Sequence, residues 1–447
     1  MRGVEKGPSA AFRASEFDPA PRGGYKYDSM SASANLLDTL RERGFVDQVT
    51  EPAQELRALL GAPTSAYIGF DPTAASLHVG SLVPIMALVH LQRAGHRPVA
   101  LVGGGTGLVG DPSGRTELRR VMTRDEVAAN AESIRAQLAR FVDFSGGRAL
   151  LVNNADWLVP LNYLEFLRDV GRQFSVNRML AAEAYRTRYE SPDGLNFLEF
   201  NYMLLQAYDF HHLCAQHGCR LQMGGSDQWG NIVAGIDLIR RLGGPPAFGI
   251  TFPLITTAAG TKMGKTAAGA VWLDAARTSP YDYYQFWINS DDRDVARFLA
   301  LFTLLPMDDV RALTGAAGAD ARAAKRRLAF EATRLAHGGE EARKAESAAA
   351  ALFGGGAGFS ETALREAPTA EIPAAELAEG IEAFDLFQRV GLAKSRGEAR
   401  RLIEGGGAYV GGRAVAAFND RVTAADAADG RILLRAGKKK YLLLRLV

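Results

Sequence analysis

Cysteine is nearly absent from this chain of 447 residues, which carries only Cys214 and Cys219. Two cysteines cannot build a disulfide scaffold, and their scarcity is typical of proteins in a reducing cytoplasm. Apolar runs long enough to span a bilayer are also missing. The polar residues 1–33 lack the apolar core of a secretory signal, and we interpret them as a disordered N-terminal extension. We therefore expect a cytoplasmic protein with no membrane segment.

The chain also lacks a large excess of positive or negative charge. The formal net charge is +2, with 23% charged and 47% hydrophobic residues, which is ordinary for a globular protein. This balance excludes a global basic field, so any surface for nucleic acid must be local. Residues 384–447 are such a local exception, because they carry 13 Lys and Arg against 6 Asp and Glu.

Short apolar runs alternate with stretches of helical periodicity through residues 34–268. This alternation predicts βαβ units and therefore an α/β, Rossmann-like domain with a mostly parallel sheet. Ligands of such sheets bind beyond the carboxyl ends of the strands. The expected strands are residues 64–70, 98–102, 149–153 and 220–223, and the expected helices are residues 36–44, 80–94, 119–141 and 229–242.

The rest of the chain has a different organisation, and its length suggests about three domains in all. Residues 269–350 read as a helical domain. Residues 351–383 are rich in Ala, Gly and Glu, and we interpret them as a linker with at most short helices. Residues 384–447 combine a basic helix with glycine-rich turns and short strands, which predicts a small α+β domain.

Residues 262–266 read Lys-Met-Gly-Lys-Thr and lie in a loop rich in Gly and Thr. Two lysines and a hydroxyl suit a polyphosphate whose charge moves during a reaction. The segment is not a P-loop, because three residues separate Gly260 from the Gly-Lys-Thr, where a P-loop has four. We expect Lys262, Lys265 and Thr266 to bind phosphates.

His78 opens a predicted helix, in a segment that reads His-Val-Gly-Ser over residues 78–81. Free N–H groups and the helix dipole favour anions there. A histidine at this position can donate to a phosphate oxygen, and Gly80 allows close approach of the backbone. A lone histidine is more often structural, but the lysine loop supplies a second signal.

Tyr202, Gln206 and Asp209 are spaced i, i+4 and i+7, and therefore share one helix face among apolar neighbours. A phenol, an amide and a carboxylate on a buried stripe require a polar partner. A ligand is one such partner, and a structural network is the alternative. Residues 224–231 follow a strand, and their glycines permit close approach to a ribose, whose hydroxyls Asp227 can accept from.

Two other patterns point elsewhere and carry less weight. Residues 105–110 match GxGxxG after a strand, as in dinucleotide-dependent dehydrogenases, but no acid ends the next strand. His211, His212, Cys214, His217 and Cys219 match no standard zinc spacing, so we expect no metal site.

The segments 78–81 and 262–266 together resemble the HIGH and KMSKS signatures of class I aminoacyl-tRNA synthetases. With residues 67–73, 103–114, 202–209 and 224–231, they resemble the bacterial tyrosyl-tRNA synthetases over residues 34–447. Ser81 stands where HIGH ends in His, and Gly264 and Thr266 replace the serines of KMSKS.

The resemblance implies a tyrosine–tRNA ligase that uses ATP with Mg²⁺ and no tightly bound cofactor. Tyr67 and Asp209 would bind the tyrosine hydroxyl, and Asp111, Tyr202 and Gln206 its ammonium group. The remaining implied site residues line the pocket or hold ATP. They are Gln222 and Gln228 beside tyrosine, and Gly69, Asp71, His78, Gly80, Ser81, Gly225, Asp227, Lys262 and Lys265 around ATP.

The same resemblance implies a homodimer whose interface lies in an insertion at about residues 122–201, and a KMSKS-like loop at residues 257–268. The helical domain 269–350 would contact tRNA. Residues 384–447 resemble the S4 RNA-binding domain, with Lys394, Arg396, Arg400, Arg401 and Arg413 as the expected RNA-binding side chains. A solvated basic surface is the simpler alternative for this segment.

Two rival functions remain open from the sequence. A tryptophanyl-tRNA synthetase would have a related fold but no S4 tail. A catalytically idle RNA-binding protein could also use this fold.

Overall fold

The computed structural model describes residues 35–113, 122–258, 260, 263–266, 269–315, 320–353, 368–411, 413–427, 430–437 and 440–447. The chain divides into two compact units, residues 1–339 and residues 340–447. The expectations for residues 1–33 and for Lys262 lie outside the described residues.

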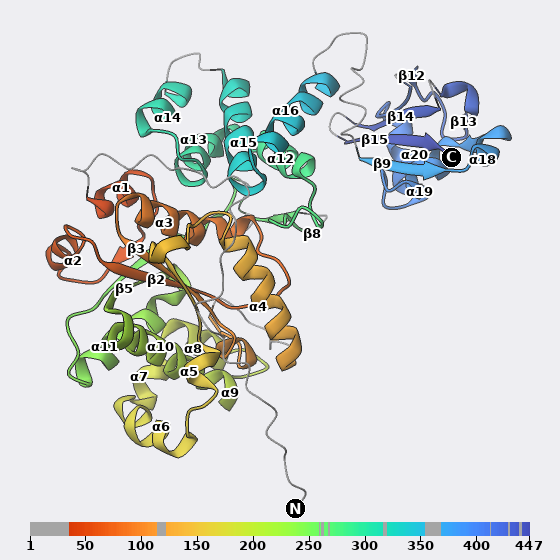
Figure 1. The fold of residues 1–447 in the computed structure, drawn as a ribbon. Coiled ribbons are helices and arrows are strands. Elements are labelled where there is room, and N and C mark those ends of the chain that lie inside the picture. The colour runs from red at the N-terminus through yellow and green to blue at the C-terminus, as the bar shows by residue number, and fades with distance from the viewer. Residues whose placement is uncertain are drawn as a thin grey trace, which may run out of the picture. The chain divides into compact units, whose positions relative to one another are not determined.

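A six-stranded sheet forms the centre of the first unit, in the order β1-β6-β5-β2-β3-β4 (Figure 1). Strands β6, β5, β2, β3 and β4 are parallel, and β1 is antiparallel to β6. The predicted α/β class is confirmed, and each predicted strand is within two residues of its observed ends. The strands are β1 Gln48–Val49, β2 Ser65–Phe70, β3 Arg97–Val102, β4 Leu150–Asn153, β5 Cys219–Gly225 and β6 Phe248–Phe252.

Helices cover both faces of this sheet, which is why its inner strands are apolar on both sides. Helix α3 (Leu82–Arg93) lies on one face, and α10 (Tyr202–His217) and α11 (Trp229–Arg241) lie on the other (Figure 1). Helix α4 (Arg124–Leu138) contacts β3 and begins with a capping box at Thr123 and Glu126. Two short helices, α1 (Leu36–Glu42) and α2 (Ala53–Leu59), precede the first parallel strand.

The sheet has a switch point between β2 and β5. From β2 the chain proceeds outward through β3 and β4, and it then returns to add β5 and β6 on the other side of β2. The chain therefore leaves the carboxyl ends of β2 and β5 in opposite directions. Ligands of open α/β sheets bind at such a point. Tyr67 on β2 is the direct neighbour of Gln222 on β5.

Five short helices connect β4 to α10: α5 (Ala155–Leu158), α6 (Tyr163–Asp169), α7 (Val176–Ala181), α8 (Glu183–Tyr189) and α9 (Phe197–Phe200). A buried ion pair joins α8 to α9, with 3.1 Å between Arg188 and Glu199. We expected an insertion from about residue 122, and this start is wrong. Residues 122–153 supply α4 and β4 to the sheet layer itself, so the extra helices begin only at Ala155.

The predicted helical region after the sheet is confirmed as helical. In the first unit it contains α12 (Pro280–Ile288), α13 (Asp292–Phe302), α14 (Met307–Thr314) and α15 (Ala321–His337). Helix α16 (Gly339–Phe353) falls almost wholly in the second unit. Throughout the described parts of the chain, no helix combines the length and apolarity needed to cross a membrane.

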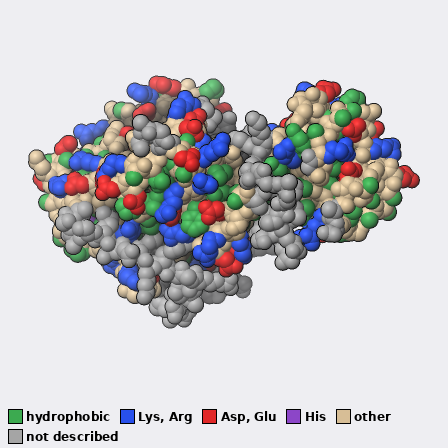
Figure 2. Space-filling model, turned by 90° about the horizontal axis from the view of Figure 1, so that it is seen from above, with side chains coloured by type: hydrophobic (Ala, Val, Ile, Leu, Met, Phe, Trp, Pro, Cys, Tyr) green, Lys and Arg blue, Asp and Glu red, His purple; other side chains and the backbone are tan. Residues whose placement is uncertain are grey.

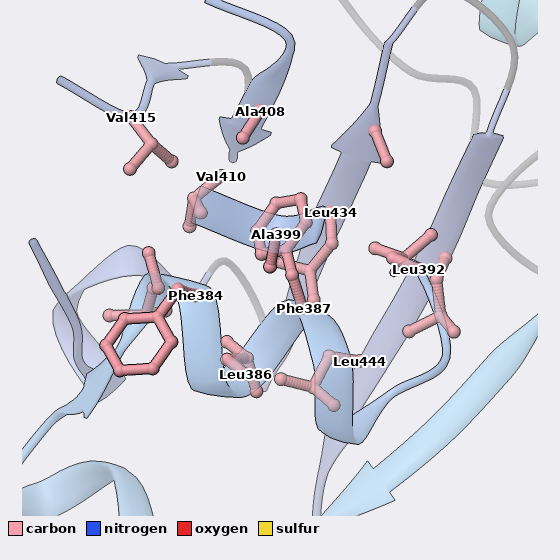
Figure 3. Close-up of a cluster of buried hydrophobic side chains, with 14 of the residues drawn as sticks. Phe384, Leu386, Phe387, Leu392, Ala399, Ala408, Val410, Val415, Leu434 and Leu444 are labelled. Carbon is pink, nitrogen blue, oxygen red and sulfur yellow. The ribbon is translucent and has the colours of Figure 1, made fainter. Parts of the chain in front are cut away.

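The second unit has its own five-stranded sheet, in the order β12-β11-β14-β15-β9. Figure 3 shows its core, where side chains of α19 such as Phe384 and Phe387 meet Leu434 and Leu444 from the sheet. Its elements are β9 Thr369–Ile372, α18 Ala374–Ala378, β10 Ile381–Glu382, α19 Ala383–Arg389, α20 Arg396–Glu404, β11 Ala408–Val410, β12 Arg413–Ala414, β13 Arg421–Val422, β14 Arg431–Ala436 and β15 Lys440–Leu446.

The expected linker 351–383 is wrong in its second half. Strand β9 pairs in parallel with β15, so residues 369–372 form one edge of the sheet. Strand β10 also pairs with a later strand, β13, and this pair is antiparallel. The domain therefore begins before Thr369 instead of at residue 384, because its sheet needs this strand.

Lys and Arg are interspersed with Asp and Glu over the face of the first unit that Figure 2 shows. This agrees with the low net charge of the chain and with the absence of a global basic field.

Candidate active site

Asp71 lies directly after β2 and is held from two directions. Its Oδ1 accepts from the Thr106 hydroxyl at 2.7 Å, and its Oδ2 accepts from the Tyr202 hydroxyl at 2.8 Å. Gly103 is required beside it, because a Cβ at that residue would lie 2.0 Å from Asp71 Oδ1. The glycine-rich loop after β3 therefore packs against the carboxylate of Asp71. In a dinucleotide-binding fold, the loop with the GxGxxG pattern would instead contact the phosphates of the cofactor.

Asp209 on α10 is buried and accepts from two side chains that come from the start of α5. Asn154 Nδ2 donates to its Oδ2 at 2.8 Å, and Trp157 Nε1 donates to its Oδ1 at 2.7 Å. Burial raises the pKa of Asp209 to about 8, although both donors oppose that shift. A carboxyl held in this way is a fixed, buried hydrogen-bond partner.

Tyr67 and Gln222 form a second buried pair, on neighbouring strands at the switch point. The Tyr67 hydroxyl and Gln222 Oε1 are buried, and neither has a hydrogen-bond partner among the described residues. Burial, followed by the nearby charge of Asp209, raises the pKa of Tyr67 well above its usual value. Because buried polar atoms are nearly always satisfied, two orphaned atoms side by side indicate a polar ligand.

Asp111 anchors a network of amides on the other side of the pocket. Its Oδ2 accepts from Gln228 Nε2 at 2.7 Å, and its Oδ1 accepts from the backbone N–H of Ser113 at 2.8 Å. Asn231 Nδ2 donates to Gln206 Oε1 at 3.1 Å and to Gln228 Oε1 at 3.2 Å. The network fixes two carbonyl oxygens and a carboxylate, which together can bind an ammonium group.

The two signature segments meet in the structure. The N–H of Gly80 donates to His78 Nδ1 at 3.0 Å, so a neutral His78 ring carries its proton on Nε2. Gly264 lies against this turn, because a Cβ on it would be 3.0 Å from Val79 Cγ2 and 3.1 Å from Gly80 N. Its φ of +86° also favours glycine, which explains the departure from serine at this position.

The remaining ATP-side residues are only partly described. Lys265 and Thr266 make up the short strand β7 (Lys265–Thr266), which pairs with β8 (Gly269–Ala270). Gly225 ends β5, and Asp227 lies in the 3₁₀ turn Ser226–Gln228. Gly69 lies on β2, and the Ser81 N–H donates to the carbonyl of His78 at 2.7 Å. Phosphate binding by these residues stays a prediction.

Four residues of the site were missed from the sequence: Thr106, Asn154, Trp157 and Asn231. Asn154 directly follows β4, so the rule that ligands bind at carboxyl ends of strands could have found it. Trp157 gave no such signal, because it lies on a helix of four residues far along the chain from Asp209.

All five expected RNA-binding side chains of the second unit are exposed. Three of them also have contacts inside the unit. Arg396 pairs with Asp385 at 2.6 Å, and Arg413 pairs with Asp426 at 3.1 Å. The Arg400 guanidinium lies 4.4 Å from the ring centroid of Phe384 and 4.8 Å from that of Phe418. Lys394 and Arg401 are the other two.

Sequence comparison gives the class of protein. Residues 60–354 match the family described as tRNA synthetases class I (W and Y), and residues 362–444 match the tyrosine–tRNA ligase SYY-like C-terminal domain. The first match spans more than half of the chain. The chain therefore belongs to the class I tRNA synthetase family, as its two signature segments predicted.

Its relatives within the family are more specific. A tyrosine–tRNA ligase of Desulfosudis oleivorans is 60% identical over 91% of this chain and 98% of that protein. Another, from Clostridium beijerinckii, is 50% identical over 91% and 98%. A C-terminally truncated mitochondrial tyrosyl-tRNA synthetase of Aspergillus nidulans has a TM-score of 0.65 at 32% identity, covering 71% of this chain and 94% of that one.

A tryptophanyl-tRNA synthetase of Encephalitozoon cuniculi has a TM-score of 0.52 at 14% identity, which shows a shared fold alone. The predicted resemblance to tyrosyl-tRNA synthetases is confirmed by the relatives. The dehydrogenase alternative is wrong, because the GxGxxG segment lies within the synthetase match.

Proposed function

We propose that the chain is a tyrosine–tRNA ligase. It activates L-tyrosine with ATP to tyrosyl-adenylate and then transfers tyrosine to the 3′-terminal ribose of tRNA(Tyr). The observation that carries this proposal is the pair formed by Tyr67 and Asp209, a buried hydroxyl without a partner next to a buried carboxyl. A phenol beside them could accept from the Tyr67 hydroxyl and donate to the carboxyl, whereas an apolar ring would leave the Tyr67 hydroxyl without a partner and Asp209 with only its two protein donors.

The second end of the substrate fits the opposite side of the pocket. Asp111 and the amide oxygens of Gln206 and Gln228 offer acceptors for an ammonium group, and Tyr202 is aligned by Asp71. With the phenol and the ammonium group bound at opposite ends, the carboxylate of tyrosine is left for reaction. It attacks the α-phosphate of ATP and expels pyrophosphate.

This reaction requires no nucleophile from the protein, because the substrate carboxylate is already charged. The work of the chain is to position the reactants and to stabilise charge on the phosphates. His78 Nε2–H, Lys262 and Lys265 would supply donors, and Asp227 with Gly225 would hold the ribose. We expect Mg²⁺ to arrive with ATP, since it prefers phosphate oxygens and water.

We further propose a homodimer. Of the eleven large apolar side chains that are exposed among the described residues, seven lie between residues 159 and 198. They are Val159, Tyr163, Leu164, Val176, Tyr189, Phe197 and Leu198. An apolar surface of this kind is usually covered, and a second copy of the chain is the partner we infer. Sedimentation velocity would show a monomer if this inference is wrong.

The helical region and the second unit would contact tRNA, through exposed basic side chains such as Lys394 and Arg401. We expect the reaction to occur in the cytoplasm, where the two cysteines, both buried and free, stay reduced.

ATP–pyrophosphate exchange with each of the twenty amino acids tests the ligase proposal. We expect exchange with tyrosine and very little with any other amino acid. Exchange with tryptophan would favour the related synthetase, and no exchange at all would favour a non-catalytic RNA-binding protein.

A further inference from the structure

Asp294, near the start of α13, is a carboxylate in an unusual place. Its side chain is 5% exposed, yet it lies in the helical part of the first unit, away from the pocket residues described above. A buried charge is costly unless hydrogen bonds satisfy it. Both oxygens of Asp294 are in fact used, and one of them binds the loop that carries the two lysines.

The contacts join α13 to the stem of that loop. Asp294 Oδ2 accepts from the backbone N–H of Ala258 at 2.7 Å. Its Oδ1 accepts from Arg297 at 2.7 Å, and Arg297 in turn donates to the carbonyl of Thr256 at 2.5 Å. One ion pair therefore holds an N–H and a carbonyl of the same short stretch of backbone.

The stem leads directly into the KMSKS-like segment. The N–H of Met263 donates to the carbonyl of Ile255 at 2.9 Å, which ties the start of this segment to the stem. Gly264 follows and packs against the His78 turn. Among the described residues, the stem is thus held by α13 at Thr256 and Ala258, and Gly264 lies against the residues that precede α3.

Helix α13 is itself anchored to the sheet domain. Arg43 is buried, and its guanidinium donates to the carbonyls of Ala300, Thr303 and Leu305 at the end of α13. Arg43 thereby satisfies carbonyls that the helix end leaves unpaired. Helix α13 also contacts α3, which begins at the His78 turn. A continuous packed path therefore links the loop stem to His78.

We propose that Asp294 and Arg297 are positioning residues for phosphate activation. They set the place of the lysine-bearing loop relative to His78, although neither touches ATP. This inference rests on the proposed function, because it assigns the role of the loop in adenylate formation. Small errors in placing a charged group can cost about 100-fold in rate.

Single-turnover formation of tyrosyl-adenylate tests the inference in the full-length chain. We expect Asp294→Ala and Arg297→Ala to lower the rate constant about 10- to 100-fold. The dissociation constant for tyrosine should stay within about twofold, because the pocket is untouched. Asp294→Asn keeps an acceptor for the Ala258 N–H, and Arg297→Lys keeps a charge, so both should recover part of the rate.

The matched control is Arg293→Ala. Arg293 lies on the same helix and pairs with exposed Asp291 at 2.9 Å, and its side-chain hydrogen bonds among the described residues all go to Asp291 and not to the loop stem. It should leave the rate constant unchanged. Equal effects of Arg293→Ala and Arg297→Ala, or a lower melting temperature with an unchanged rate, would mean a purely structural role and overturn the inference.

Hydrogen exchange separates a failure of this inference from a failure of the proposed function. Amides of residues 255–263 should exchange faster in Asp294→Ala and Arg297→Ala than in Arg293→Ala, with or without activity. A wild type that does not activate tyrosine would refute the function alone. Unchanged exchange in both variants would refute the positioning role, whatever the activity.

Discussion

The proposed tyrosine site and the stem of the lysine loop both follow strands of one sheet, but they are held in different ways. In the pocket, Asp71, Asp111 and Asp209 each accept from side chains of other elements, and all of these contacts are at least partly buried. The loop is held by its backbone, through Asp294 and Arg297 on one side and the His78 turn on the other. Selection of a hydroxyl requires fixed partners, whereas charge developing on phosphates requires correctly placed donors.

The pocket side of this comparison predicts the largest effect. Phenylalanine lacks the hydroxyl, so it would leave the Tyr67 hydroxyl without a partner and would give Asp209 no donor beyond Asn154 and Trp157. Tyrosine should be preferred by about 10⁵-fold, a general value measured on tyrosyl-tRNA synthetases. Asp209→Ala should lose most tyrosine activity. Tyr67→Phe should lose less and mainly relax the rejection of phenylalanine. The measurement is kcat/KM for both amino acids.

Tyr208→Phe is the control for this first prediction, because it removes a hydroxyl from the neighbouring residue of α10, whose ring packs against Phe166. It should leave the preference intact. Equal use of phenylalanine by the wild type would refute the assigned substrate.

The loop side predicts the next largest effect. Lys262→Ala and Lys265→Ala should each cost roughly 2–4 kcal/mol in adenylate formation, because each removes a charged contact that strengthens as pyrophosphate leaves. ATP affinity should change much less. Lys344→Ala, which removes a partly exposed lysine on α16 that pairs with Glu340 and Glu341, is the control. Weaker ATP binding at an unchanged rate constant would contradict the assigned role.

Local sequence patterns predicted the pocket side only in part. The spacing of Tyr202, Gln206 and Asp209 correctly placed them on one helix face, since helical periodicity is a local property. Their actual partners are Asp71, Asn231 and the pair Asn154 and Trp157, which come from other elements. Such pairings depend on how strands and helices pack, and spacing within one helix cannot give them.

The domain boundary shows the same limit. Strand β9 has an Ala- and Glu-containing sequence without the alternation of a half-buried strand, so composition suggested a linker. It is a strand because Leu443, Leu444, Arg445 and Leu446 of β15 offer a free edge some seventy residues further on. The pairing of β9 with β15 depends on tertiary structure, whereas α20 was predicted from its own basic residues.

The second unit predicts a smaller effect, confined to tRNA. A chain ending at Phe353 retains the whole sheet domain, and a related structure is also of a C-terminally truncated enzyme. Adenylate formation should stay near the wild-type rate, and kcat/KM for tRNA charging should fall about 100-fold, with a weaker dependence on salt. Normal charging by this folded truncation would refute the RNA-binding role.

Single substitutions sharpen the truncation test within the full-length chain. Arg401→Ala should weaken charging and reduce its salt dependence, because it removes an exposed charge from α20. Arg389→Ala should do neither, since Arg389 is paired with Glu376 at 2.5 Å on another helix.

The smallest predicted effect is a pH dependence that only the pocket should show. Burial raises the pKa of Asp209 from 3.8 to about 8, so the free enzyme holds a proton there at neutral pH. A carboxylate accepts from a phenol better than a carboxylic acid does. The kcat/KM for tyrosine should therefore rise roughly tenfold between pH 7 and pH 9, the range over which a group of this pKa ionises.

The stability of the fold should respond to the same proton in the opposite direction. Because folding raises the pKa, the contribution of Asp209 is full below about pH 4 and is lost as pH rises through about 8. Asp209→Asn has no such proton, so both the kinetic step and this part of the stability slope should disappear. Identical pH profiles for wild type and Asp209→Asn, in kinetics and in denaturant unfolding, would show that the carboxyl is ionised throughout. The donors Asn154 and Trp157 would then outweigh burial, and fixed hydrogen bonds would dominate the electrostatics of the pocket as well as its geometry.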